Sequence, residues 1–241
     1  MTYVLIHGGG STGRFWDRSM PLLDGTALAV DLPGRGEHPA DLATITVDDE
    51  VASILGDIDA AGLTDIVLVA HSSGGLPVPG VARGLGDRLA RIVLNAALVP
   101  PDGGCGLDCM RPHDAEGLRA AAAATSGPGT PITLPGAPAE PEKFRRTYGG
   151  DPLNDADLAY CVDPVRCVPD GVHHYFQPVT WRDVPDVPIT YVVNDRDRPV
   201  TTERQDEMVG YLPHAPTVVR LDCGHIPAVT HATEFAAIVT R

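Results

Sequence analysis

The stretch LVAHSSGG, residues 68–75, decides how the rest of the sequence is interpreted. An apolar run ends in two serines and two glycines, which is typical of a buried strand that turns sharply into a helix. A serine at such a turn can act as a nucleophile when small residues flank it in the pattern small-x-Ser-x-small. An ordinary turn has the same composition, so residues elsewhere in the chain must decide between the two interpretations.

Spacing selects one of the two serines. The outer positions of the pattern must be small, because the strand and helix backbones nearly touch at a tight turn. Ala70 and Gly74 meet this requirement around Ser72. A pattern centred on Ser73 would place His71 in the crowded position. We therefore assign the candidate nucleophile to Ser72.

The chain as a whole shows the alternation of an α/β protein. Its apolar runs are nearly continuous, as expected for parallel strands that are covered on both faces. We predict one domain over residues 1–241, with a mostly parallel sheet of about six strands flanked by helices. Pro77 and Pro79 predict an irregular or delayed helix after the serine turn. The expected strands are 3–6, 27–30, 65–70, 91–96, 188–193 and 217–221, and the expected helices are 46–62, 201–212 and 231–241.

The alternation stops between residues 100 and 185, a stretch rich in proline that contains four of the five cysteines. A long insertion between two sheet strands is more often a functional cap than a second domain. We therefore predict a cap or lid over residues 100–185 within the single domain.

Composition limits the partners of the chain. Its 32 acidic and 18 basic residues give a net charge of −14, which argues against nucleic acid or an anionic membrane as a partner. No signal peptide or apolar run of membrane-spanning length is visible, so a cytoplasmic location and free thiols are expected. The cysteine spacings match no usual zinc pattern, and we expect no metal. The abundance of Ala, Gly, Pro and Arg suggests a bacterial source.

Activation of Ser72 requires a base and an acid that orients it. His225 follows a late strand in a glycine-containing loop, and it is the best candidate for the base. Asp197 is favoured as the acid over Asp195, which is expected to sit too deep if it follows its strand directly. Asp222 lies too close to His225 along the chain.

Other polar residues have weaker assignments. The Ser73 N–H, next to the nucleophile, and the Gly9 N–H, in the loop after the first strand, are the expected donors to an oxyanion. His71 is expected to point away from the nucleophile. His173 and His174 lie in the insertion, where exposed loop residues are the commoner interpretation and pocket lining is the alternative.

Taken together, the chain resembles the α/β-hydrolase family over nearly its whole length, and in particular its small methylesterase and hydroxynitrile-lyase branch. The resemblance implies that Ser72, Asp197 and His225 form a catalytic triad and that Gly9 and Ser73 form an oxyanion hole, with no cofactor. The matching stretches are VLIHGGGSTGRFWDRSMPLL, AVDLPGRGEHP, LVAHSSGG, VVNDRDRPV and LDCGHIPAVTHATEFA.

Three positions depart from the family pattern. Ser73 stands where a bulky apolar residue is usual, and Thr230 stands where an acidic residue is often found. Ile226 replaces the lysine that hydroxynitrile lyases of this branch carry, which speaks against that activity. The residues of the insertion match nothing that identifies a substrate.

We therefore expect a serine hydrolase of the carboxylesterase type that cleaves a small apolar or aromatic ester, with a role in bacterial secondary metabolism as a conjecture. The alternatives are a non-hydrolytic lyase or cyclase on the same scaffold and a ligand-binding protein without turnover. The expected partner is a small-molecule substrate, and a homodimer is left open. The candidate substrate-binding aromatic residues, for which packing in the core or the cap is an alternative of at least equal weight, are Trp16, Tyr175, Phe176 and Trp181.

Overall fold

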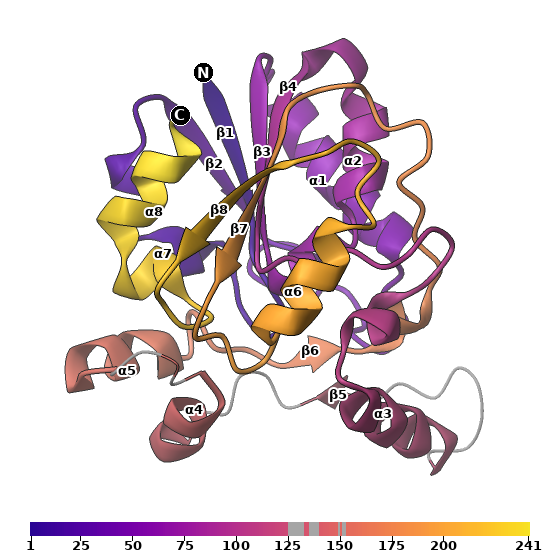
Figure 1. The fold of residues 1–241 in the computed structure, drawn as a ribbon, viewed down its shortest axis with the longest axis vertical. Coiled ribbons are helices and arrows are strands. Elements are labelled where there is room, and N and C mark those ends of the chain that lie inside the picture. Colours follow the sequence, from indigo (N-terminus) through magenta and orange to yellow (C-terminus); the bar gives the residue numbers. More distant parts are fainter. Residues whose placement is uncertain (125–132, 135–139, 149, 151–152) are drawn as a thin grey trace.

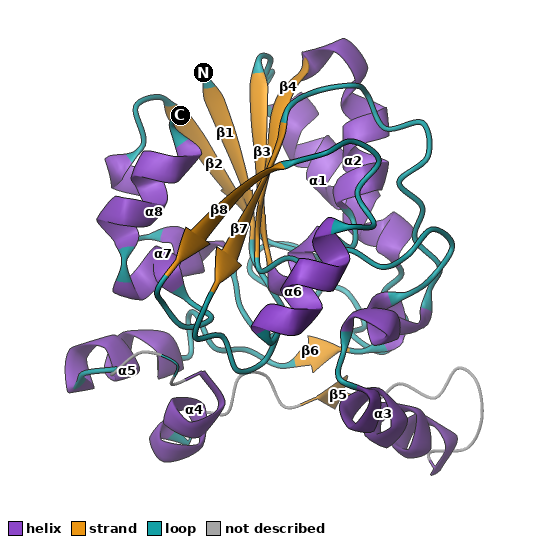
Figure 2. Cartoon of the chain, viewed as in Figure 1, coloured by secondary structure: helices purple, strands orange, loops and turns teal. Residues whose placement is uncertain are grey.

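Six parallel strands form the centre of the computed structural model, in the order β2-β1-β3-β4-β7-β8 (Figures 1 and 2). The structure describes residues 1–124, 133–134, 140–148, 150 and 153–241. Every predicted strand is confirmed to within two residues, and so is the α/β class. The strands are β1 (Thr2–Ile6), β2 (Thr26–Val30), β3 (Ile66–His71), β4 (Leu89–Asn95), β7 (Ile189–Asn194) and β8 (Thr217–Leu221).

Alternating side chains bury the sheet on both faces. Val4 and Ile6 point into one core and Tyr3 and Leu5 into the other, as the period of two along a strand requires. The first core is covered by α1 (Val47–Ala60), α2 (Val78–Leu85) and α6 (Thr202–Val209), and the second by α7 (Pro227–Thr230) and α8 (Ala232–Val239). The three predicted helices are confirmed, each shorter than its sequence pattern.

Local sequence explains where α1 and α2 begin. The Thr46 hydroxyl accepts the Asp49 N–H at 3.0 Å, and the Asp49 carboxylate accepts the Thr46 N–H at 2.9 Å, so a capping box starts α1. After Ser72, a short 3-10 turn, η3 (Ser72–Gly75), precedes α2. Pro77 caps α2 and Pro79 occupies its first turn, where a missing N–H breaks no helical bond. The predicted delayed helix start is confirmed.

The chain between β4 and β7 spans residues 96–188, and the helices described within it lie beyond the carboxyl ends of the strands (Figure 1). We call it the β4–β7 segment. Part of the predicted cap, at 125–132, 135–139, 149 and 151–152, lies outside the described residues. Among the residues described, every helix is too short or too polar to cross a lipid bilayer. The segment contains η5 (Gly106–Cys109), α3 (Pro112–Ala124), β5 (Thr133–Leu134), α4 (Pro141–Tyr148), α5 (Asp155–Val162), β6 (Asp170–Gly171) and η6 (His173–Phe176).

Three further 3-10 turns connect the elements of the sheet layers. They are η1 (Gly13–Trp16), η2 (Met20–Leu22) and η4 (Gly86–Arg88). The first of these follows the glycine loop after β1, and it buries Phe15 and Trp16 against the second core. The glycine loop is therefore held at both ends, by β1 before it and by the buried residues of η1 after it.

Glycine lets α2, which follows the serine turn, pack closely on α1. A Cβ on Gly80 would lie 2.6 Å from Cγ2 of Val51, whereas a Cβ on Gly56, in the exposed part of α1, would meet nothing within 4 Å. We expect Gly80→Ala to lower the free energy of unfolding by about 1 kcal/mol, because overpacking outweighs the gain in helix propensity. Gly56→Ala should raise it by about 0.5–1 kcal/mol.

Urea unfolding of both variants, followed by circular dichroism, measures these changes. The two substitutions are chemically identical and both lie in helices, so their opposite signs isolate the helix contact. Equal stabilisation by both would contradict the close packing of α1 and α2.

Candidate active site

Ser72 sits at the turn between β3 and η3 in a conformation that non-glycine residues rarely adopt, with φ at +53°. Its surroundings leave no room for larger neighbours. A Cβ on Gly8 would lie 2.8 Å from the Cβ of Ser72, and a Cβ on Gly74 would lie 2.5 Å from the carbonyl oxygen of His7. Strain of this kind costs about 1–3 kcal/mol and persists at functional sites where packing enforces it. The turn therefore holds the Ser72 side chain at the carboxyl edge of the sheet.

His225 and Asp197 form a buried hydrogen-bonded pair. Nδ1 of His225 donates to Oδ2 of Asp197 at 2.7 Å, and both side chains are almost fully shielded from solvent. The other carboxylate oxygen of Asp197 accepts the N–H of Val200 at 2.9 Å, which fixes its orientation. With Nδ1 protonated, Nε2 of neutral His225 is an acceptor, as a general base requires. The loops after β7 and β8 bring this pair together.

The two other candidate acids lie elsewhere. Asp195 forms an ion pair with Arg220 at 2.7 Å, and Asp222 forms one with Arg196 at 3.0 Å. The expectation that Asp195 sits too deep is wrong, since the residue is exposed. Its side chain leaves the sheet edge toward solvent, and the turn that follows directs Asp197 inward instead.

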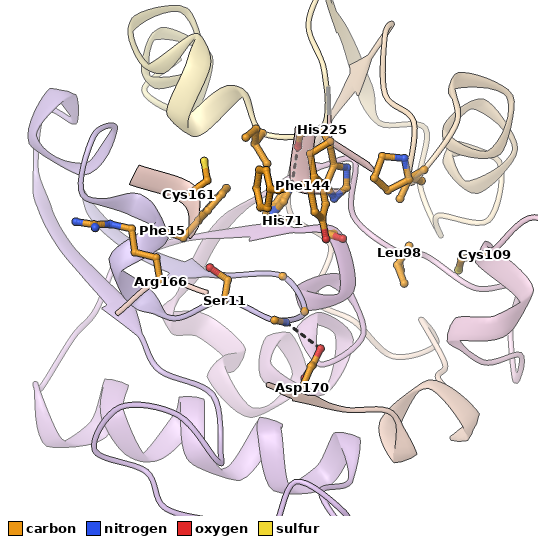
Figure 3. A pocket seen from close by; sticks show the side chains of 18 of the residues that line it. Ser11, Phe15, His71, Leu98, Cys109, Phe144, Cys161, Arg166, Asp170 and His225 are labelled. Atoms are coloured by element: carbon orange, nitrogen blue, oxygen red, sulfur yellow. Dashed lines mark hydrogen bonds between the residues drawn. The ribbon is translucent and has the colours of Figure 1, made fainter. Parts of the chain in front are cut away.

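One cavity of about 340 Å³ contains Ser72 and His225 in its lining (Figure 3). It lies between the carboxyl edge of the sheet and the β4–β7 segment, and Gly9 forms part of its wall. The volume suits a small molecule. The lining is mainly apolar and aromatic, with the serine, the histidine and the carboxylate of Asp170 among its polar groups.

The four aromatic candidates divide between cavity and core. Tyr175 lines the cavity. Trp16 is fully buried and stacks on Phe235, with ring centroids 5.8 Å apart. Trp181 and Phe176 pack in or against the first core. Core packing, the stated alternative, therefore describes Trp16, Trp181 and Phe176, because large rings are favoured in cores as well as in pockets.

Four aromatic residues that the sequence analysis did not name also line the cavity. Phe15 precedes Trp16 in η1, and the others, Phe144, Tyr148 and Tyr160, come from the β4–β7 segment. The Tyr148 ring stacks on the His225 imidazole, with centroids 5.7 Å apart. The insertion has no recognisable periodicity or motif, so the sequence carried no signal for these residues beyond their aromatic character.

His71 supports the loop of the catalytic histidine candidate. Its Nε2 donates to the carbonyl oxygen of His225 at 2.8 Å, and its ring stacks on Phe15 (Figure 3). Burial lowers the pKa of His71 well below its ordinary value, so the ring is neutral. His71 lines the cavity beside His225, a role that its position next to Ser72 in the sequence did not predict.

The two histidines of the insertion do not line the cavity. His174 is buried, with Nδ1 3.8 Å from a carboxylate oxygen of Glu50, and burial lowers the pKa of His174 to about 4. The exposed-loop interpretation is therefore wrong for His174, whereas His173 is half-buried. The hydrophobic residues around η6 draw the chain inward at this point.

Asp170 and Arg35 form a buried ion pair that the sequence analysis missed. Asp170 also accepts the N–H of Gly10 at 3.0 Å, at the edge of the cavity (Figure 3). Arg35 belongs to the AVDLPGRGEHP stretch, residues 29–39. Nothing in the sequence connects Arg35 with an aspartate 135 residues later. Within the described chain, no cluster of three or more His, Cys, Asp or Glu residues could hold a metal ion.

Comparisons with known proteins agree with this architecture. The family model "Alpha/beta hydrolase family" matches residues 3–238. The probable hydrolase R7 of a Phoma species is 28% identical over 83% of this chain and 80% of its own. The carbendazim hydrolyzing esterase of a Nocardioides species is 31% identical over 42% of this chain and 43% of its own. For that esterase and for the dihydrolipoyllysine-residue acetyltransferase component of the acetoin cleaving system of Cupriavidus necator, the chain spans less than half of the relative's own length.

The fold is also found among solved structures. An extracellular alpha/beta-hydrolase from a Paenibacillus species, which shares structural and functional homology with tobacco salicylic acid binding protein 2, superposes with a TM-score of 0.79. The superposition covers 99% of this chain and 97% of that one, at 22% identity. The family match over nearly the whole sequence and the six-stranded parallel sheet lead to one conclusion: the chain belongs to the alpha/beta hydrolase family.

Proposed function

We propose that the protein is a serine esterase that hydrolyses a small ester of apolar or aromatic character. The observation that carries the proposal is the buried hydrogen bond between His225 and Asp197, together with the cavity that His225 and the strained Ser72 both line. A neutral imidazole with its Nδ1–H held by a carboxylate is oriented to accept a proton at Nε2. Relatives named as esterases and hydrolases support the same reaction class.

In the first step Oγ of Ser72 attacks the ester carbonyl carbon while Nε2 of His225 takes the hydroxyl proton. The Asp197 carboxylate stabilises the imidazolium that forms. When the tetrahedral intermediate collapses, His225 returns the proton to the alcohol oxygen, and the alcohol leaves with an acyl group on Ser72. Water then attacks the acyl-enzyme, again with His225 as the base, and releases the acid.

Two backbone donors stabilise the negative oxygen of each tetrahedral intermediate in this scheme. Ser73 is at the first turn after the nucleophile, where helix N–H groups lack intrahelical partners. The Gly9 N–H also has no hydrogen-bond acceptor among the described residues, and Gly9 lines the cavity. Such preorganised donors supply much of the rate enhancement of acyl transfer.

The cavity supports a small and mostly apolar substrate. Phe15, Leu98, Phe144 and Ile226 contribute apolar surface near the nucleophile. About 340 Å³ is at the small end of ligand pockets, which favours a compact ester over a long acyl chain. We further propose that residues 100–185 act as the cap of the site, since Phe144 of α4, in this range, lines the cavity.

Covalent labelling tests the nucleophile. A fluorophosphonate should modify Ser72, and Ser72→Ala should abolish both the adduct and the turnover of p-nitrophenyl esters. Ser11→Ala is the matched control, because Ser11 lines the same cavity. This variant should keep the adduct at Ser72, as shown by peptide mass spectrometry. Turnover that survives Ser72→Ala would sink the acyl-enzyme mechanism.

Two aspartates two residues apart give a matched test of the acid. Asp197→Asn should lower kcat by roughly 10³–10⁴-fold, because the amide does not hold His225 in the tautomer that accepts a proton. Asp195→Asn should leave kcat within about twofold, since Asp195 is exposed and pairs with Arg220. Steady-state kinetics on one ester measures both variants. The assignment fails if Asp195→Asn is the more damaging change.

A further inference from the structure

Ser73 departs from the family pattern, and its hydroxyl has no task in the proposed reaction. In the structure Ser73 is buried, and its hydroxyl lies near the hydroxyl of buried Tyr175, which comes from η6 of the β4–β7 segment. The polar side chain at position 73 is thus matched by a polar partner from far along the sequence. Because a buried hydroxyl without a partner is costly, the two neighbouring hydroxyls favour this position of Ser73 relative to η6.

Asp170, which lies three residues before the start of η6 at His173, makes a similar connection to the glycine loop. Its Oδ2 accepts the Gly10 N–H at 3.0 Å, and the N–H of Val168 donates to the Gly10 carbonyl at 3.0 Å. Gly10 has φ at +67°, a conformation that favours glycine. Both backbone polar groups of Gly10 are therefore held by the same short stretch of the β4–β7 segment.

The two connections meet over Gly9. A Cβ on this residue would lie 2.4 Å from Oδ2 of Asp170, 2.8 Å from the hydroxyl of Tyr175 and 3.2 Å from Oγ of Ser73. Three polar side-chain atoms from two separate parts of the chain thus pack directly against Gly9. They leave its backbone little freedom to shift or rotate.

Charge keeps Asp170 in this position. Its Oδ1 binds the guanidinium of Arg35, which also donates to the carbonyl of Pro33 at 3.3 Å. The side chains of the pair are 5% and 2% exposed, so neither exchanges its partner for water. Glu50 lies nearby, but burial raises the pKa of Glu50 to about 8, so it is mainly protonated near neutral pH. Asp170 thus supplies the negative charge that compensates Arg35.

We propose that Asp170 and Tyr175 are positioning residues, which hold the two oxyanion donors of the proposed esterase, the N–H groups of Gly9 and Ser73, at a fixed separation. Residues 168–176, which we call the oxyanion strap, thus connect the β4–β7 segment to the catalytic machinery. The inference rests on the proposed function for its kinetic consequence. Donors that are fixed before the reaction stabilise a developing charge without reorganisation, so loosening them lowers kcat more than it raises KM.

The hydroxyl pair allows a test with nearly isosteric changes. Tyr175→Phe and Ser73→Ala each remove one hydroxyl and keep the Ser73 N–H. We expect each to lower kcat about 10-fold with KM within about twofold, and the double variant to lose no more than the worse single variant. Tyr211→Phe is the control, because it removes a tyrosine hydroxyl bound to Glu207 on the surface. It should leave kcat and KM unchanged.

The ion pair needs a different design, because removing one partner leaves a buried charge unpaired. The double variant Asp170→Leu/Arg35→Met removes both charges and keeps the buried side-chain volume similar. We expect this variant to fold, to lose about 10- to 100-fold in kcat, and to keep the pH midpoint of kcat, since His225 and Asp197 are untouched. Amide hydrogen exchange should also accelerate at least 10-fold at Gly10 while β3 stays protected.

Exchange separates this inference from the proposed function. Suppose that the parent protein shows no Ser72-dependent turnover but that amide exchange at Gly10 accelerates in Asp170→Leu/Arg35→Met. The esterase proposal then fails, whereas the role of the oxyanion strap in fixing the glycine loop is supported. If Ser72-dependent turnover is present, two results would overturn the inference. One is an unchanged kcat in both Tyr175→Phe and Asp170→Leu/Arg35→Met. The other is a rise in KM in these variants with no fall in kcat.

Discussion

The close approach of β3 to the helix that follows it is the constraint on which the site depends. Ser72 adopts a φ of +53° because the backbone must reverse within a few residues, and Gly8 and Gly74 leave the space for it. Parallel strands all end at the same edge, so the loops after β7 and β8 deliver Asp197 and His225 to this turn. The position of Ser72 at this edge thus follows from packing that is set by very small residues.

The sequence predicted the sheet well because buried parallel strands leave continuous apolar runs of β-branched residues. It also predicted that Ser72, Asp197 and His225 belong together, and the structure places His225 on Asp197 and in one cavity with Ser72. The sequence could group these three residues because each lies in the turn or loop that follows a strand. Because these loops share one edge of the sheet, their side chains have few other places to lie.

The remaining part of the site could not be predicted for a physical reason. Asp170, Phe144 and Tyr148 reach the cavity from a segment without periodicity, so only tertiary packing places them. The pairing of Arg35 with Asp170 links positions 135 residues apart and leaves no local pattern. Large rings gave the opposite error: Trp16 was a candidate for the pocket lining but lies in the core. Hydrophobicity alone does not distinguish a core from a pocket lining.

A single structure would test the central claim that Ser72 is the nucleophile of an acyl transfer site. The measurement is a crystal structure of the protein after reaction with a phosphonate ester, whose tetrahedral adduct resembles the intermediate of ester hydrolysis. The account predicts phosphorus bonded to Oγ of Ser72, with one phosphonyl oxygen about 3 Å from the N–H groups of Gly9 and Ser73. An adduct on any other residue, or an oxygen that faces away from both N–H groups, would contradict it.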